Sequence, residues 1–204
     1  MTTSTYANNP QFFNLDLLSQ SGDADLAKQL AFIPGIKEML MLRQVHALEH
    51  ATVWVLSEAQ NAFYNLGDRQ TLGGLSTEQG FYLYGQVNKI KLERAVNVAL
   101  QRLTSGEWNL ALHPRCGTNV SAGILLAVTL AVGFHLILPR GPIEQILGLG
   151  LAATTAAHFA PEVGILAQRY ITTAIPFNLA VENIKTAPDS WGQVAYFVQV
   201  RWVE

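Results

Sequence analysis

Residues 120–138 read VSAGILLAVTLAVGFHLIL, and this stretch decides the fold class. It contains no Asp, Glu, Lys or Arg, and His135 is its only titratable side chain. A hydrocarbon core about 30 Å thick is crossed by a helix of about 20 apolar residues. The stretch therefore predicts a transmembrane helix.

A second, weaker apolar segment follows directly. The connection PRGP at residues 139–142 has the composition of a tight turn, and IEQILGLGLAATTAAHFA at 143–160 is rich in Gly and Ala. Small residues let membrane helices pack closely. We expect a transmembrane helical hairpin over residues 119–160. A soluble all-α protein with two buried helices is the alternative, because adjacent core helices have similar sequences.

The distribution of basic residues predicts the orientation of this hairpin. Its connection contains Arg140 as the single cation, whereas the flanks hold many. The flanking cations include Arg43, Arg69, Lys89, Lys91, Arg94, Arg102, Arg115, Arg169, Lys185 and Arg201. Positive charge favours the cytoplasmic side. The sequence thus predicts an integral membrane protein of the plasma or thylakoid membrane, with both termini in the cytoplasm.

The overall composition agrees with a membrane protein. Half of the 204 residues are hydrophobic and 14% are charged, against about 25% in ordinary soluble domains. The net charge of −2 gives no basic surface, so a nucleic-acid partner is not expected. Membrane lipid and a membrane-protein complex are the expected partners. One cysteine excludes an intrachain disulfide. The first residues, MTTSTYANNPQFF, lack the features of a signal peptide.

The segments around the hairpin predict a mainly α fold with minor α+β character. Residues 1–33 are expected to form a tail or a short amphipathic helix. Residues 34–118 are expected to form a cytoplasmic region, with a helix over 34–60, a strand at FYLYG (81–85) and a helix between a cap at Asn88 and Gly106. Residues 161–204 are expected to be an interfacial or cytoplasmic segment, with an amphipathic helix interrupted at Pro176 and a strand at the C-terminus.

The first predicted helix contains HALEH at residues 46–50. On a helix His46 and His50 lie one turn apart on the same face, and Glu49 lies beside them. H-x-x-E-H is the inverted zincin signature, in which two histidines bind zinc and the glutamate accepts a proton from water. Two histidines on a polar helix face are the alternative interpretation.

A second short motif, LHPRCGTN at 112–119, directly precedes the apolar stretch. It places His113 and Cys116 in a turn shaped by Pro114 and Gly117. Histidine and cysteine are both good zinc ligands. We therefore expect the metal ligands His46, His50, His113 and Cys116, binding zinc or another divalent transition metal. A turn with a buried free thiol is the alternative.

These motifs resemble a known family. The pairing of H-x-x-E-H-x-T with HPRCGTN before a transmembrane segment resembles the YqhQ-like family of predicted metal-dependent bacterial membrane proteins. The segments GLSTEQGFYLYG (74–85) and LTSGEWNLALHPRCGTN (103–119) resemble an uncharacterised cyanobacterial membrane-protein family more closely. The resemblance implies a metal site at the residues named above, membrane embedding and a photosynthetic host. The inverted zincins have a later glutamate as third ligand, and no counterpart stands out here, which argues against a protease.

Three further polar residues are candidates for function. Arg115, between the two loop residues, can bind a substrate anion or a lipid headgroup, or pair with Glu49. His135 and His158 fall within apolar segments, where titratable groups often have a function. Each can ligate chlorophyll or haem, or form a hydrogen bond within the hairpin.

Two functional hypotheses follow from the sequence. In the first, the protein is a zinc-dependent membrane enzyme, a hydrolase in which Glu49 is the catalytic base and three residues hold the metal. In the second, all four ligands close a structural zinc site, and the protein is an assembly or accessory factor of a photosynthetic membrane complex. The sequence does not decide between them.

Overall fold

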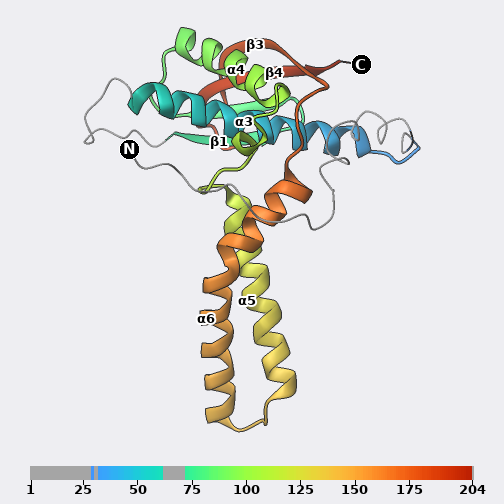
Figure 1. The fold of residues 1–204 in the computed structure, drawn as a ribbon, viewed down its shortest axis with the longest axis vertical. Coiled ribbons are helices and arrows are strands. Elements are labelled where there is room, and N and C mark those ends of the chain that lie inside the picture. Colours follow the sequence, from blue (N-terminus) through green and yellow to red (C-terminus); the bar gives the residue numbers. More distant parts are fainter. Residues whose placement is uncertain (1–28, 30–31, 62–71, 204) are drawn as a thin grey trace.

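A computed structural model describes residues 29, 32–61 and 72–203. The tail predicted for residues 1–33 lies mostly outside the described residues, as does Arg69. The described chain forms two parts (Figure 1). We call the part built from α3, α4, η1 and a four-stranded sheet the head, and the pair α5 and α6 the hairpin.

The long helix of the head is α3 (Ile36–Asn61), close to the helix predicted for 34–60. Asn88 begins the next helix, α4 (Lys89–Thr104), because its side chain accepts a hydrogen bond from the Ile90 amide, as predicted for the cap. A short 3-10 helix, η1 (Trp108–Ala111), then leads to the HPRC loop.

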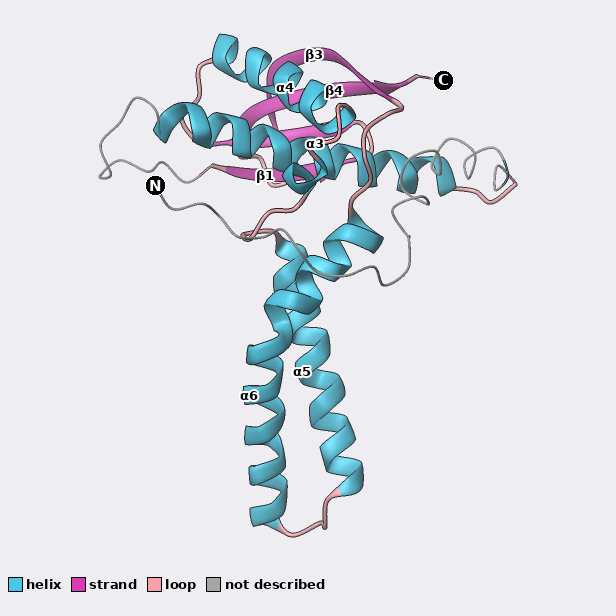
Figure 2. Ribbon diagram, viewed as in Figure 1, coloured by secondary structure: helices cyan, strands magenta, loops and turns pink. Residues whose placement is uncertain are grey.

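The sheet joins strands from both sides of the hairpin in the sequence. β1 (Gly73–Thr77) and β2 (Gly80–Tyr84) precede it, whereas β3 (Leu179–Pro188) and β4 (Val194–Trp202) follow it. The antiparallel order is β1-β2-β4-β3, with Phe81 opposite Val198. Figure 2 shows α3 and α4 beside these strands. The hairpin is therefore an insertion in one α+β head.

The head has a continuous apolar core. Alternate residues of the strands point toward the helices, as the period of two in a strand requires. The fully buried members include Val45, Leu48, Phe81, Leu83, Leu92, Val96, Leu103 and Val198. This packing fixes α3, which carries HALEH, against the sheet.

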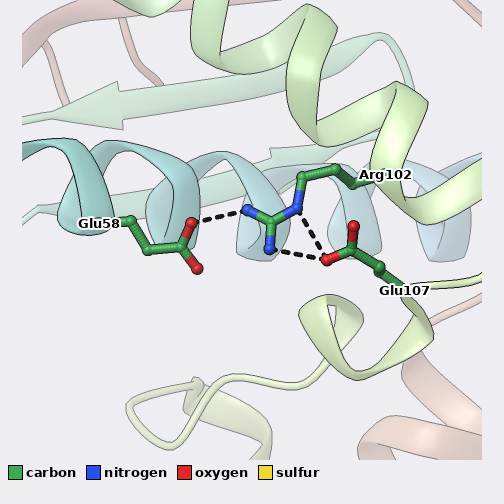
Figure 3. Close-up of polar contacts among 3 residues, drawn as sticks. All are labelled: Glu58, Arg102 and Glu107. Atoms are coloured by element: carbon green, nitrogen blue, oxygen red, sulfur yellow. Dashed lines mark hydrogen bonds and ion pairs between the residues drawn. The ribbon is translucent and has the colours of Figure 1, made fainter.

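One ion-pair group connects the end of α3 to η1. Arg102 of α4 donates to the Glu58 carboxylate on α3 at 2.7 Å and to Glu107, the residue before η1, at 2.8 Å (Figure 3). Both carboxylates raise the pKa of Arg102 above its ordinary value through these hydrogen bonds. The group holds the start of the segment that leads to the HPRC loop.

The hairpin consists of α5 (Gly117–Ile137) and α6 (Pro142–Ala167), which pack side by side and project from the head (Figure 1). Their close approach uses small residues, with Gly148, Ala152, Ala156 and Gly164 buried on α6. A Cβ on Gly164 would collide with Asn119 at the start of α5.

The outer surface of the hairpin is apolar. No residue of α5 is buried, and many large aliphatic side chains face outward on both helices. They include Val120, Ile124, Leu125, Val128, Val132, Leu136, Ile137, Ile143, Ile146, Leu147, Leu149 and Leu151. Of the helices in the described chain, α5 is the one long and apolar enough to cross a membrane. The predicted membrane hairpin is therefore not confirmed, and α5 alone qualifies as a candidate span by length and composition.

The region after α6 differs from the prediction of an amphipathic helix interrupted at Pro176. The helix ends in a single π turn, η2 (Gln168–Thr172), and the chain then extends into β3. Pro176 has no amide hydrogen to continue a helix. Leu179 and Ile184 are buried in the core because β3 pairs with β4. The sheet partner overrides the local helical pattern.

Candidate metal centre

Helix α3 presents His46, Glu49 and His50 at the side of the head nearest the hairpin. The two imidazole centroids lie 4.3 Å apart, as expected for residues one turn apart on one helix face. His50 is buried and His46 is partly buried.

Both imidazoles are oriented by backbone carbonyls. His46 Nδ1 lies 3.0 Å from the Thr172 carbonyl oxygen, and His50 Nδ1 lies 2.6 Å from that of Ala111. A carbonyl oxygen only accepts, so each Nδ1 must carry the hydrogen. In its neutral form each ring then has a lone pair on Nε2, whereas a protonated ring donates a hydrogen bond from that atom. This carbonyl–histidine pairing is the arrangement that orients metal-binding histidines.

Cys116 brings a sulfur atom to the same point. It is the N-cap of α5, and its Sγ accepts from the Thr118 amide at 3.4 Å while lying 3.3 Å from His46 Nε2. The ligand atoms of His46, His50 and Cys116 all lie within 4.8 Å of one another. Burial raises the pKa of the thiol, but hydrogen bonds from His50 and Thr118 outweigh burial and leave the pKa below its ordinary value.

This cluster fits a cation. With both rings neutral, two imidazole lone pairs face one thiol, which has a single proton to donate, so one lone pair would have no donor. A metal ion removes this conflict because it accepts electron pairs from all three atoms. Two imidazoles and one thiolate form a donor set typical of zinc. The residues present could therefore hold a metal ion.

His113 lies beside the cluster but outside it. Its ring centroid is 5.6 Å from that of His50 and 5.1 Å from the Trp54 ring. Its Nδ1 accepts from the Arg115 amide at 3.3 Å, within the loop. Burial, then the charges of His50 and Arg115, lower the pKa of His113 to about 4. The structure thus brings three of the four predicted ligands together and places a neutral His113 next to them.

Glu49 lies on the adjacent side of α3, against strand β1. It is buried, and Ser76 Oγ donates a hydrogen bond of 2.6 Å to its carboxylate. A Cβ on Gly74 would collide with this carboxylate, so the glycine leaves the space that Glu49 occupies. Burial raises the pKa of Glu49, although the Ser76 hydrogen bond and the nearby His46 oppose the rise.

A cavity of about 640 Å³ joins these groups. Its wall contains the cluster, Glu49 and His113, with Arg115 as a further member. The other wall residues are mainly apolar and include Met39, Leu42, Val53, Leu72 and Ile171. Glu49 and the three candidate ligands therefore face a common space large enough for a small molecule.

A residue that no sequence motif indicates fixes the HPRC loop. Gln168, fully buried at the start of η2, accepts from the His113 amide at 2.8 Å and donates to the His113 carbonyl at 3.2 Å. It also donates to Asn119 Oδ1 at 2.6 Å, and Asn119 donates to the Pro114 carbonyl at 2.9 Å. The only signal for Gln168 in the sequence is an amide at the end of an apolar segment.

The two histidines of the hairpin lie apart from the metal centre. His135 Nδ1 is 2.7 Å from Gln145 Oε1 on α6, so it forms a hydrogen bond across the hairpin turn. His158 is exposed and contacts the ring of its neighbour Phe159 at 4.9 Å. Of the roles predicted for His135, the hydrogen bond within the hairpin is present.

Comparison with known proteins gives a family without an assigned reaction. A family model described as a domain of unknown function, DUF6391, matches residues 41–184, which include the cluster, Glu49 and the hairpin. An uncharacterised protein of the cyanobacterium Picosynechococcus sp. (strain ATCC 27264 / PCC 7002 / PR-6) is 51% identical over 184 residues, covering 89% of this chain and 90% of that protein. No solved structure matches the chain.

Proposed function

The chain belongs to the DUF6391 family of uncharacterised proteins, with a cyanobacterial relative, and from its geometry we propose that it is a zinc-dependent membrane hydrolase. The observation that supports this proposal most strongly is the three-donor cluster at the wall of a cavity. Structural zinc sites have four protein ligands, whereas catalytic sites have three and an open position. Among the described residues, the cluster has three members.

The proposed roles follow from placement. His46, His50 and Cys116 would hold the metal, which would supply a Lewis acid and lower the pKa of a bound water molecule. Glu49, in the same cavity, would accept a proton from water at this site, and its burial raises its pKa above the ordinary value. His113, neutral beside His50, lines the cavity and is not a fourth ligand in this proposal.

The proposed location is a membrane. The 21 residues of α5 give a helix about 31 Å long at 1.5 Å per residue, close to the thickness of a bilayer core. Exposed aliphatic side chains on both helices would be covered by lipid chains. With the hairpin inserted from the cytoplasmic side, the head and both termini lie in the cytoplasm and the metal centre lies at the membrane surface.

An open coordination position can be tested without knowing the substrate. The full-length protein in detergent is loaded with Co²⁺, whose absorption spectrum reports its ligands. We expect a thiolate charge-transfer band from Cys116, absent in Cys116→Ser, and a spectral change when acetohydroxamate is added. A cobalt spectrum that does not respond to acetohydroxamate would indicate a closed, structural site and would contradict the enzyme proposal.

The role of Glu49 is tested by a conservative substitution. With p-nitrophenyl esters of acetate to laurate as probes, Glu49→Gln should keep its zinc and lose about 10²–10⁴-fold in hydrolysis rate, the usual contribution of a general base. Glu93→Gln, an exposed residue of α4, is the matched control and should hydrolyse the esters at the wild-type rate. Equal rates for Glu49→Gln and wild type, with equal zinc, would remove Glu49 from the mechanism.

A further inference from the structure

The cavity beside the metal centre has an apolar rim at the base of the hairpin. Met39 and Leu42 of α3 and Ile171 of η2 line it, and their side chains are 49%, 40% and 68% exposed. Gly117 and Thr118, which begin α5, also line the cavity. The rim is thus continuous with the segments that enter and leave the hairpin.

Two cations, Arg43 and Arg115, line this largely apolar space, and Arg43 donates hydrogen bonds to the Tyr170 and Thr173 carbonyls. Arg115 lines the cavity and is exposed, and no described residue forms a hydrogen bond or an ion pair with its guanidinium group. Glu49 is the one carboxylate in the wall, and it already accepts from Ser76. A guanidinium group binds carboxylate or phosphate through paired hydrogen bonds, most strongly where apolar walls exclude water.

We propose that the cavity binds a single amphiphile from the bilayer, with its acyl chain along the Met39–Leu42–Ile171 rim and its anionic group on Arg115. This inference rests on the proposed function, because it assigns the substrate class of the same site. The labile bond of such a molecule, an ester or amide between chain and headgroup, would lie between the rim and Arg115, where the metal centre is.

The size of the cavity is that of a small-molecule site. It holds about 640 Å³, within the range of cavities that bind small molecules. A flexible acyl chain can follow its apolar rim.

Native mass spectrometry of the full-length protein in a neutral detergent tests the proposal. Dioleoylphosphatidylglycerol, dioleoylphosphatidylcholine and oleoyl-coenzyme A are titrated separately, and zinc content is measured on the same samples. We expect phosphatidylglycerol to bind at one site, about tenfold more tightly than phosphatidylcholine, since a charged hydrogen-bonded contact has that magnitude. Oleoyl-coenzyme A should bind more weakly, because the proposed source is the bilayer.

Matched variants separate this site from general attraction to lipid. Arg115→Gln should weaken phosphatidylglycerol binding about tenfold, whereas Arg140→Gln at the hairpin tip should not. Leu42→Gln should weaken binding of both phospholipids, whereas Ile90→Gln, an equally apolar exposed position on α4, should not. All four variants should keep the wild-type zinc content.

The possible failures are distinct. The lipid site is overturned if the two phospholipids bind equally, or if the Arg115 and Arg140 substitutions have equal effects. The proposed hydrolase is then still judged by its zinc content and by the Glu49 experiment. Preferential binding of oleoyl-coenzyme A overturns the bilayer source. If wild-type protein contains no zinc but still binds phosphatidylglycerol through Arg115, the hydrolase proposal is refuted. The cavity is then a lipid-binding site without catalytic zinc.

Discussion

Gln168 shows how one buried amide determines the geometry of the candidate site. Its side-chain oxygen accepts a hydrogen bond from the His113 amide. Its side-chain nitrogen donates hydrogen bonds to the His113 carbonyl and to Asn119 Oδ1. These contacts tie the HPRC loop, and with it Cys116, to the turn after α6. The turn also supplies the Thr172 carbonyl that orients His46. Ligand loop and ligand helix are therefore positioned by the same five-residue segment.

We predict that Gln168→Leu lowers zinc affinity by about 10–100-fold, the usual effect of losing a residue that supports metal ligands. The shape of the side chain is nearly kept, but the buried backbone groups of His113 lose their partners. Competition with a zinc-binding dye measures the affinity. Gln145→Leu, which removes a hydrogen bond to His135 in the hairpin, should leave it unchanged. Equal affinities for Gln168→Leu and wild type would show that the loop is held by other contacts.

Gly74 leads to a second prediction at this scale. A methyl group there would collide with the Glu49 carboxylate, and Glu49 would have to leave its place beside Ser76. Gly74→Ala should therefore keep zinc and lose most of the ester hydrolysis expected of wild type. Gly73→Ala is the neighbouring control, since a Cβ at Gly73 meets only the Tyr84 ring at 4.0 Å. Equal rates in the two variants would contradict a catalytic role for Glu49.

The candidate ligands and their supporting residues differ in how far the sequence predicts them. His46 and His50 follow from helical spacing, and Cys116 follows from residue type beside a turn. Gln168 and Gly74 do not, because an amide and a glycine acquire their roles only from neighbours 55 and 25 residues away. His113 was predicted as a ligand from the same loop as Cys116. The loop turns its imidazole toward Trp54, and no local pattern encodes that direction.

At the scale of elements, α5 carries the proposal of a membrane location, because it is long and apolar enough to span a bilayer. An arginine at the centre of a transmembrane helix costs about 2.5–3.5 kcal/mol in insertion. Val128→Arg should therefore shift a large part of the protein from the membrane pellet to the alkaline-carbonate supernatant, or to degradation. Ile90→Arg, at an exposed position of α4, should not. Full retention of Val128→Arg in the pellet would argue that α5 is not a membrane-spanning helix.

Among the elements, periodicity predicts those with strong local signals. α3, α4 and α5 lie close to their predicted ranges, because an apolar stripe, an Asn cap and a long apolar run act within the element itself. β3 was missed because its apolar residues become buried only when β4 pairs with it. The second helix of the hairpin was predicted as a helix, but its content of Gly, Ala and Thr does not make it apolar enough to qualify as a span.

At the scale of the whole molecule, the head is built from chain segments on both sides of the hairpin. β4 lies between β2 and β3, so the sheet that supports α3 forms only after the hairpin has been made. The candidate metal centre likewise uses α3, the loop before α5 and the turn after α6. Folding of the head and assembly of the site are therefore coupled.

This coupling predicts that a defect in β4 releases the metal. Val198→Asp places a charge in the core, where an unpaired ion costs several kcal/mol, and should abolish both cooperative unfolding and zinc binding. Val194→Asp makes the same change on the same strand at a side chain that is 67% exposed, and should behave as wild type. Circular dichroism melting and zinc content measure the two effects. Zinc retained by a destabilised Val198→Asp protein would show that the site is independent of the sheet.

The central claim, a metal ion held by His46, His50 and Cys116 with His113 outside the coordination sphere, is tested most directly by zinc stoichiometry. Plasma mass spectrometry on full-length protein purified without chelators should find about one zinc per chain in wild type and in His113→Ala. His46→Ala and Cys116→Ala should each lose it. Wild-type protein without metal, or zinc retained in His46→Ala and Cys116→Ala, would contradict the account.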